Sequence, residues 1–291
     1  MDALVPAASE KALRLFAKQV RRGVVAQPVD DVLRIGVDLG TANIVIAVVD
    51  GANNPVAGAW AHSTVIRDGI VVDWMGTVAH VRRLLESIEQ RLGHKFSCMS
   101  LDVPPGISAG NVQVMANVVT ACGLDVGEVV DEPVAAARLL AVTDGCVIDI
   151  GHGTTGVSVL DGGRLVCSTD QATGGHHMTL VVAGRLGLEY EAAENYKTNP
   201  ANQEEVMGIV TPTLTKMATI ARDAIVGFDP PVVYLVGGAS LCLNAPEIFT
   251  QVLGRPVLRP VEPLFITPLG VPMTAAPTDS PQHSRKEARH G

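Results

Sequence analysis

The chain has 291 residues, of which 47% are hydrophobic, 3% aromatic and 18% charged. This composition is typical of a globular protein with one large or two medium domains and excludes an intrinsically disordered chain. A formal net charge of −8 and the scarcity of aromatic rings argue against a general binder of nucleic acids or anionic membranes.

The five cysteines are scattered and form no C-x-x-C pattern. This favours free thiols in a reducing compartment over a disulfide framework or a zinc site. The sequence has no apolar run of about 18 residues, and its first residues lack the apolar core of a signal peptide. We therefore expect a cytoplasmic protein without a membrane-spanning segment.

Residues 1–33 form an N-terminal extension with one helical pattern. Ser9 is a candidate N-cap of this helix, and Gly23 is a candidate residue for its C-terminal end. The apolar residues of the pattern share one face, and they are Leu13, Phe16, Ala17 and Val20. Two interpretations are open: a helix docked on the body of the protein, or a recognition tag that lays its apolar face into a partner groove.

Residues 34–51 predict a β-hairpin with a polar tip. Two runs of β-forming residues, 35–39 and 44–49, are joined by Gly40, Thr41, Ala42 and Asn43. Backbone N–H groups in such a tight turn can form an anion-binding nest, so the tip is a candidate phosphate cradle.

The same pattern returns 111 positions later, at residues 146–162. Acidic and turn residues keep their register through both hairpins: Asp38 and Asp149, Gly40 and Gly151, Asp50 and Asp161, Gly51 and Gly162. The repeat predicts two similar lobes whose hairpin tips clamp a nucleotide. Two ordinary hairpins are the alternative, because Asp-Gly is a common turn pair.

Strands alternate with helices along the rest of the chain, which predicts an α/β protein. In lobe I, residues 34–143, we expect a third strand at 55–60, a turn and short strand at 67–71, further strands at 97–103 and 126–130, and helices at 77–92, 108–122 and 133–142. In lobe II, residues 144–260, we expect strands at 164–169 and 232–236, a helix that ends near Gly187, and helices at 189–198, 204–226 and 245–253. Pro212 should interrupt the helical stretch 204–226. Residues 261–274 should form a C-terminal helix that returns to lobe I, and 275–291 a disordered tail.

Three acidic residues are candidates for the chemistry of a nucleotide clamp. Asp38 and Asp149, one per hairpin, are placed to hold the waters of Mg²⁺, which takes few protein carboxylates directly. Either could instead stabilise a turn. Glu132 precedes Pro133 at a helix start, where it could orient an attacking water or merely favour the helix dipole.

Four segments, 35–41, 131–137, 149–155 and 235–240, resemble in order the signatures of the actin–Hsp70–sugar kinase ATPase superfamily. The resemblance covers roughly residues 34–274. It implies a two-lobe actin-like ATPase fold, made of duplicated RNase H-like domains around a central nucleotide cleft, with ATP or ADP and Mg²⁺ as cofactors. Catalytic roles fall on Glu132 and Asp149, and metal-holding roles on Asp38 and Asp149. The implied cofactor-binding residues are Gly40, Thr41, Asn43, Gly151, His152, Gly153, Thr154, Gly174, Gly175, Glu194, Lys197, Gly237, Gly238 and Ala239.

Within this superfamily the chain is most similar to the EutJ family of ethanolamine-utilization proteins, through residues 65–74, 131–135, 172–180 and 264–269. That family is Hsp70-like and is encoded with bacterial microcompartment proteins. The resemblance implies an ATP-dependent chaperone or reactivating factor. Its client would be an ethanolamine-pathway enzyme or a microcompartment shell protein, and its location the cytoplasm in association with a microcompartment.

Three positions depart from the Hsp70 pattern. Ala42 replaces a threonine, His152 replaces a glycine of the second phosphate loop, and Gly156 replaces an aspartate. The segment between the hairpins is too short for the Hsp70 subdomain that supplies a catalytic lysine. We therefore expect a slow Mg-dependent ATPase. An adaptor or scaffold that has lost the ATPase and an actin-like filament protein are the alternatives.

Overall fold

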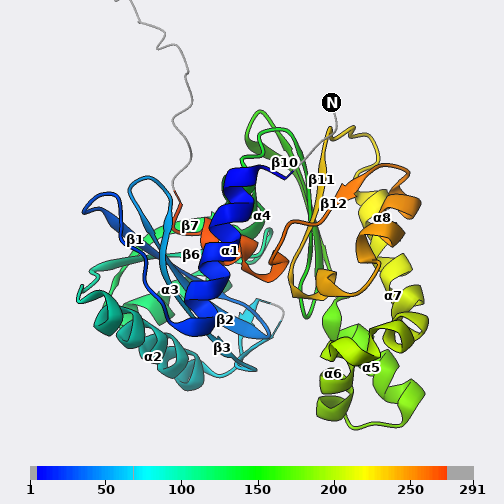
Figure 1. The fold of residues 1–291 in the computed structure, drawn as a ribbon, viewed down its shortest axis with the longest axis horizontal. Coiled ribbons are helices and arrows are strands. Elements are labelled where there is room, and N and C mark those ends of the chain that lie inside the picture. Colours follow the sequence, from blue (N-terminus) through cyan, green and yellow to red (C-terminus); the bar gives the residue numbers. More distant parts are fainter. Residues whose placement is uncertain (1–4, 68, 274–291) are drawn as a thin grey trace, which may run out of the picture.

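The computed structural model describes residues 5–67 and 69–273. It contains two five-stranded sheets, one in each half of the molecule (Figure 1). The first sheet has the order β3-β2-β1-β6-β7, and its strands are β1 (Leu33–Leu39), β2 (Asn43–Asp50), β3 (Pro55–His62), β6 (Cys98–Val103) and β7 (Asp125–Asp131). The second has the order β10-β9-β8-β11-β12, and its strands are β8 (Gly145–Ile150), β9 (Thr155–Asp161), β10 (Arg164–Gln171), β11 (Val233–Val236) and β12 (Val257–Leu258).

The two sheets repeat one topology. Each begins with an antiparallel meander of three strands and continues with two strands parallel to its first strand. Both predicted hairpins are present, with Leu39 opposite Ile44 next to the first tip and Ile150 opposite Thr155 next to the second. The predicted two-lobe fold built on a duplication is confirmed.

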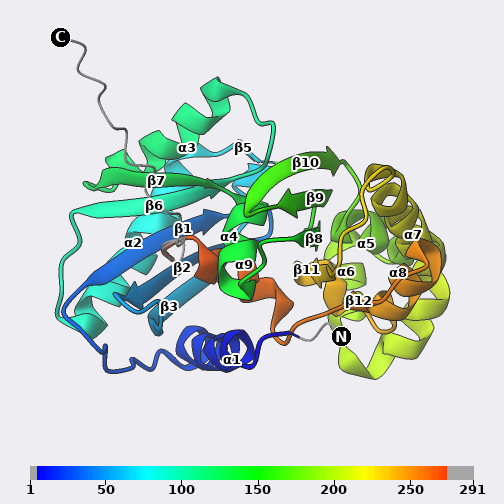
Figure 2. The ribbon, with the colours of Figure 1, turned by 90° about the horizontal axis from the view of Figure 1, so that it is seen from above.

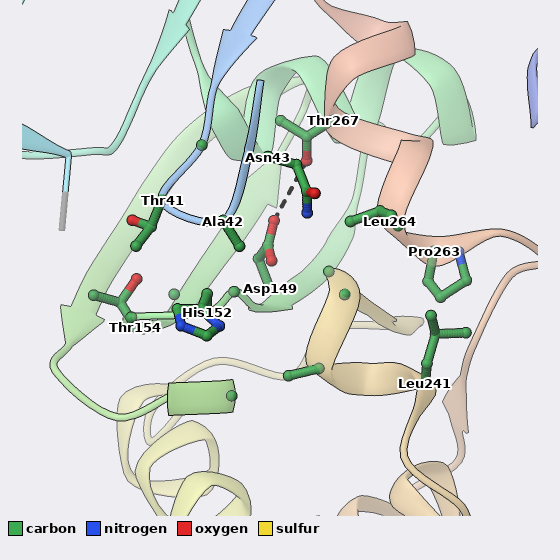
Figure 3. Close-up of a pocket in the computed structure, with 18 of the residues that line it drawn as sticks. Thr41, Ala42, Asn43, Asp149, His152, Thr154, Leu241, Pro263, Leu264 and Thr267 are labelled. Atoms are coloured by element: carbon green, nitrogen blue, oxygen red, sulfur yellow. Dashed lines mark hydrogen bonds between the residues drawn. The ribbon is translucent and has the colours of Figure 1, made fainter. Parts of the chain in front are cut away.

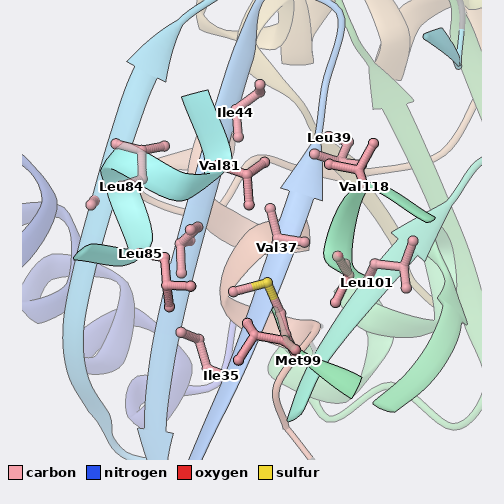
Figure 4. Packing of buried hydrophobic residues seen from close by; sticks show 14 of the residues in the cluster. Ile35, Val37, Leu39, Ile44, Val81, Leu84, Leu85, Met99, Leu101 and Val118 are labelled. Carbon is pink, nitrogen blue, oxygen red and sulfur yellow. The ribbon is translucent and has the colours of Figure 1, made fainter. Parts of the chain in front are cut away.

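The first sheet is covered on both faces, which explains its almost continuous apolar strands. One face of the sheet packs on the helices α2 (Trp74–Leu92) and α3 (Ala109–Ala121), as Figure 4 shows for Ile44 near Val81 of α2 and for Leu39 beside Val118 of α3. The alternate side chains of β2, including Val45 and Val49, face a second apolar cluster that contains α1. Because successive side chains of a strand point to opposite faces, the residues of β2 alternate between the two apolar clusters.

While Val147 and Val236 belong to the apolar cluster that also contains α1, four helices cover the opposite face of the second sheet. Side chains of α5 (Gly175–Leu186), α6 (Tyr190–Thr198), α7 (Gln203–Ala224) and α8 (Ala245–Leu253) form the apolar cluster there. Short elements complete the chain, and they are β4 (Ile66–Arg67), β5 (Ile70–Val71) and the 3₁₀ turns Pro200–Asn202, Gly238–Leu241 and Pro263–Phe265.

Two helices join the lobes. Figure 2 shows α4 (Glu132–Leu140) and α9 (Ile266–Gly270) side by side between the sheets. Their backbones approach closely because Gly270 lacks a side chain: a Cβ there would lie 1.9 Å from the Ala135 carbonyl oxygen. The predicted C-terminal helix is thus shorter than 261–274. The predicted tail, 275–291, lies outside the described residues.

The N-terminal helix α1 (Ala7–Arg22) is docked on the body. All four of its predicted apolar-face residues are buried, and Gly23 ends the helix in the left-handed conformation with φ 66°. The N-cap prediction is wrong, because the helix begins after Pro6 and Ser9 lies inside it. The Ser9 hydroxyl instead donates to the Leu139 carbonyl oxygen of α4 at 2.6 Å. With its apolar face buried, α1 does not present that face as a recognition tag.

The predicted interruption at Pro212 is also wrong, since α7 runs unbroken through it. Proline removes one hydrogen bond from a helix interior. Here Val210 and Leu214 are fully buried on either side of the proline, and their packing holds the helix together. Tertiary contacts therefore override the local preference. The other predicted elements are present with shifted ends; α2, for example, starts at Trp74 because the Asp73 carboxylate accepts the Gly76 N–H at 3.0 Å.

Candidate functional site

A cleft of about 620 Å³ lies between the lobes and is lined by both hairpin tips. It brings together every residue proposed above for catalysis, metal or cofactor except Gly174. In Figure 3, Thr41 of the first tip and Thr154 of the second lie at the same end of the cleft, and Asn43 lies near Asp149. The two tips are thus opposed, as a clamp requires.

The first tip depends on Gly40. A Cβ at Gly40 would lie 2.7 Å from the Asn43 carbonyl oxygen and 3.3 Å from the Asp38 carboxylate. Only a glycine therefore lets the chain turn this tightly behind Asp38. Asp38 itself pairs with Val45 in the ladder, one step before the turn, so its carboxylate is held at the base of the tip.

The second tip is held from behind by the start of α5. The Gly175 and His176 amides donate to the carbonyl oxygens of Gly151 and His152, at 3.0 and 2.7 Å. Gly174 packs against this loop, since a Cβ there would lie 2.6 Å from the His152 oxygen, and its N–H donates to His177 Nδ1 at 3.2 Å. The structure does not bring Gly174 to the cleft, where we predicted a cofactor contact; it shapes the loop instead.

His152 occupies its loop without backbone strain. The described non-glycine residues with positive φ are Asn53, Ala141, Asn244 and Glu262, so His152 does not need the conformation that favours glycine. Its Nε2 lies 3.0 Å from the Tyr190 hydroxyl, which lies 2.9 Å from His176 Nδ1. Burial lowers the pKa of His152, which favours the neutral imidazole. The sequence pattern gave no sign of this chain of three side chains.

Four carboxyl groups influence one another across the cleft floor. Burial, together with the charge of Asp149, raises the pKa of Asp38 to about 7. Burial also raises the pKa of Asp149 to about 6, although the Thr267 hydroxyl donates to it at 3.4 Å (Figure 3). Glu132 and Asp102 have pKa values well above their ordinary range, because burial and the neighbouring acids both oppose ionisation. A cation at this place would relieve the repulsion.

Two of the acids near the cleft escaped the sequence reasoning. Asp102 is 1% exposed at the end of β6, and its Oδ2 has no hydrogen-bond partner among the described residues. Its signal in the sequence was a single acid inside the predicted strand 97–103. Asp170 of β10 lines the cleft opposite Gly156 of β9, and a Cβ on Gly156 would lie 3.7 Å from its carboxylate. A neighbouring strand thus places an acid beside the position where the Hsp70 aspartate is missing.

The other end of the cleft contains Glu194 and Lys197, two of the residues predicted to bind the cofactor. Lys197 Nζ donates to the Glu194 carboxylate at 2.7 Å, to the Thr179 hydroxyl at 2.7 Å and to the Gly175 carbonyl oxygen at 3.0 Å. Burial alone would raise the pKa of Glu194, but the Lys197 charge and these hydrogen bonds hold it below its ordinary value. The pair is therefore ionised and fixes the rim formed by α5 and α6.

Gly237 closes the floor between the two ends. Its φ is 85°, and a Cβ would lie 2.2 Å from Asp149 Oδ1 and 2.4 Å from the Ile150 carbonyl oxygen. Its N–H donates to the Pro263 carbonyl oxygen at 3.1 Å. Both the positive φ and the lack of space for a Cβ require glycine here, directly after strand β11 and next to the Asp149 carboxylate.

The donor set fits a magnesium ion held through water. Among residues 5–67 and 69–273, no group of three or more His, Cys, Asp or Glu side chains is arranged to grip a metal by itself. Mg²⁺ usually keeps several waters and binds one or two carboxylates together with phosphate oxygens. Asp38 and Asp149, whose pKa values are raised first by burial and then by the charge of a neighbouring acid, are the side chains that would hold such a hydrated ion.

No helix in the described part of the chain has the length and apolar character needed to cross a membrane.

Comparisons with known proteins agree with this fold. The family model of cell division protein FtsA matches residues 146–284. The chain is 40% identical to ethanolamine utilization protein EutJ of Salmonella typhimurium over 243 residues, which cover 83% of this chain and 85% of that protein. EutJ of Escherichia coli is also 40% identical, over 82% of this chain and 84% of its own length.

Solved structures of other proteins share this two-lobe fold. The crystal structure of EutJ from Carboxydothermus hydrogenoformans superposes with a TM-score of 0.85 at 40% identity, and covers 90% of this chain and 97% of that chain. MreB5 of Spiroplasma citri shares the fold at 18% identity, with a TM-score of 0.66 over 83% of this chain and 95% of its own. The likeness to the curated relatives extends over more than two thirds of the chain at 40% identity, and the chain belongs to the EutJ family of ethanolamine utilization proteins.

Proposed function

We propose that this protein binds Mg-ATP in the cleft between its lobes, hydrolyses it slowly, and uses lobe movement to act on a protein client of ethanolamine utilization. The client would be a pathway enzyme or a microcompartment component, and the action that of an Hsp70-like chaperone or reactivating factor. The observation that carries the proposal is the duplicated pair of hairpin tips, which face each other across buried carboxyl groups. Two structures that share the fold are of MreB5 bound to AMPPNP and to ADP, which supports nucleotide as the ligand.

The side chains have separate tasks in this proposal. The tips orient the phosphates through backbone N–H groups and the hydroxyls of Thr41 and Thr154. Asp38 and Asp149 would hold the hydrated cation, and Glu132 would accept a hydrogen bond from the attacking water. Bound Mg-ATP would supply the transferable phosphoryl group, and its Mg²⁺ would supply the positive charge that keeps these acids ionised. The raised pKa of Glu132 suits a group that takes up a proton as the water attacks.

Phosphate release by wild type and by Glu132→Gln tests the hydrolytic part. We expect slow release by wild type and a loss of about 100-fold or more in the variant, the range for removal of a group that positions a proton. Binding of Mg-ATP should persist in the variant, because the amide keeps the shape of the side chain. Glu86→Gln, on the exposed face of α2, is the control. Equal rates in wild type and Glu132→Gln would remove Glu132 from this role.

The adaptor alternative predicts nucleotide binding without turnover, or no binding. Ala42 and Gly156 favour it, since both line the cleft without a hydroxyl or carboxylate. Asp170 beside Gly156 counts against it. Phosphate release that is absent in wild type while ATP still binds would select the adaptor.

A further inference from the structure

A second concave surface lies outside the nucleotide cleft, between α1 and the segment 259–263. It encloses about 510 Å³, and its lining residues come from α1, from the turn after β11 and from that segment: Arg14, Arg21, Leu241, Arg259, Pro260, Val261, Glu262 and Pro263. We call it the α1 groove. No motif in the sequence analysis and no part of the proposed function accounts for it.

The α1 groove carries a surplus of positive charge. Arg21 is already matched, because its guanidinium donates to both Glu262 carboxylate oxygens, at 2.7 and 2.5 Å, and lies 5.5 Å from the Phe265 ring centre. Arg14 is exposed and lies 3.8 Å from Glu10, too far for a hydrogen bond. Arg259 donates to the carbonyl oxygens of Ser240 and Cys242, at 2.6 and 3.1 Å, and these carry no formal charge.

A basic stripe extends this charge along α1. Lys11, Arg14, Lys18 and Arg22 are all exposed and recur at steps of three or four residues, so they share the outer face of the helix. The stripe is about 16 Å long, from the rise of about 1.5 Å per residue. It faces solvent on a protein whose formal net charge is −8. Such a local concentration of positive charge attracts an acidic partner.

The apolar part of the α1 groove narrows the choice of partner. Leu241 is 55% exposed at its edge, and Val261 is half-buried beside two prolines. A mixed lining of arginine and aliphatic groups suits a peptide that carries acids and at least one apolar side chain. A membrane surface suits it less, because the apolar face of α1 is packed against the body and cannot enter lipid.

The α1 groove and the nucleotide cleft share a wall. Leu241, Arg259 and Pro263 line both cavities. Arg259 is bonded to the loop that follows Ala239, and Gly237 donates to Pro263. The neighbouring Glu262 has φ 50°, in the left-handed region, and is held there by Arg21. A ligand that pairs with Arg259 therefore contacts a side chain that is bonded to the same loop that a nucleotide would contact.

We propose that the α1 groove binds an acidic, leucine-containing segment of a protein partner, and that nucleotide in the cleft changes this affinity through Leu241, Arg259 and Pro263. The coupling rests on the proposed nucleotide binding, whereas the docking does not. The partner is defined here by its chemistry: clustered carboxylates, with an apolar side chain that reaches Leu241.

The docking is tested on the full chain with a fluorescein-labelled peptide of Glu and Leu, about as long as the stripe and measured by anisotropy. The double variant Arg14→Glu/Lys18→Glu should weaken binding by about tenfold or more, because it replaces attraction by repulsion. Arg83→Glu, an exposed reversal on α2, should change it less than about twofold. Circular dichroism melts confirm that each variant is folded. Equal affinities in the double variant and wild type would overturn the docking, as would binding of phosphatidylglycerol vesicles, but not the peptide, in an Arg14-dependent way.

The coupling is tested by repeating the titration with Mg-ADP and with Mg-ATP. We expect the peptide affinity to change by about fivefold or more with nucleotide, and nucleotide affinity to change by the same factor with peptide, as linkage requires. If nucleotide binds but leaves the peptide affinity unchanged, the coupling is overturned and the docking stands. If nucleotide does not bind at all, the proposed function fails together with the coupling, and the peptide titration still decides the docking.

Discussion

At the scale of residues, the cleft floor is a set of acids held together by the fold at a cost in stability. Asp38, Asp102, Glu132 and Asp149 come from four different strands or helix starts, and burial raises the pKa of each. The charges of Asp38, Glu132 and Asp149 each raise the pKa of at least one other acid of the set. Such repulsion is tolerated where a ligand relieves it, and perturbed carboxyl groups are accordingly common at functional sites.

Because of Asp38, the free energy of unfolding of the protein should fall as pH rises. The pKa of Asp38 in the folded chain, about 7, lies above that of an unfolded aspartate, so the folded state binds the proton more tightly. Its contribution to stability is present below the unfolded pKa and is lost as pH rises toward 7. Asp38→Asn should therefore stabilise the metal-free protein by on the order of 1–2 kcal/mol more at pH 8 than at pH 5.

Urea unfolding in EDTA at the two pH values measures this difference. Asp161→Asn, at the exposed far end of the second hairpin, is the matched control and should show none. A stability difference for Asp38→Asn that does not depend on pH would show that Asp38 is not the strained acid.

A second prediction concerns Gly237, which shapes the cleft floor next to Asp149. Gly237→Ala places a methyl group 2.2 Å from Asp149 Oδ1 and must displace that carboxylate. We expect a loss of about 1–3 kcal/mol in stability, from backbone and contact strain, and loss of nucleotide binding. Gly254→Ala is the control, because Gly254 has φ 68° with nothing within 4 Å of a Cβ. Gly254→Ala should lose only the stability that a positive φ costs an alanine, and should keep nucleotide binding. If both variants bind nucleotide equally well, Gly237 does not shape the site.

The sequence predicted these residues unevenly, for a physical reason. Asp38 and Asp149 were found because a duplicated hairpin keeps the register of its acids. Asp170 was missed because its place opposite Gly156 follows from strand pairing between β9 and β10, which local sequence does not display. The position of Asp102 beside Glu132 likewise depends on how β6 and β7 align.

At the scale of elements, α1 is part of the core. Phe16 is fully buried and meets the Phe265 ring edge-on, with centroids 5.7 Å apart, and Ser9 ties the helix to α4. Periodicity predicted its buried face correctly, whereas the N-cap was placed wrongly because Ser9 bonds across the molecule rather than along the helix. The hydrophobic periodicity of a helix can be read from its own sequence, whereas the role of a capping residue also depends on its tertiary contacts.

Phe16→Ala should therefore destabilise the protein by about 3–4 kcal/mol, as truncation of a fully buried aromatic usually does. Leu15→Ala, on the half-buried side of the same helix turn, should cost clearly less. Chemical denaturation with both variants makes the comparison. If the two substitutions have similar small effects, α1 is a detachable extension and not an element of the fold.

At the scale of the whole molecule, the duplication explains both the shape and the site. Each lobe contributes one meander and one hairpin tip, and α4 and α9 cross between them. A repeat in the sequence could predict two lobes and a cleft, because both halves obey the same packing rules. The α1 groove could not be predicted, because it forms where residues 14–21 and 259–263 meet, far apart in the chain.

The central claim is that the cleft binds Mg-ATP through acids supplied by both lobes. A ligand that binds only the folded state stabilises it by about 2.7 kcal/mol at 100 times its Kd, which raises the Tm of a domain this size by about 5 °C or more. The most direct measurement is the Tm of wild type, Asp149→Asn and the control Asp161→Asn, with and without millimolar Mg-ATP. We predict this rise for wild type and Asp161→Asn and none for Asp149→Asn. No rise in wild type, or an equal rise in Asp149→Asn, would contradict the account.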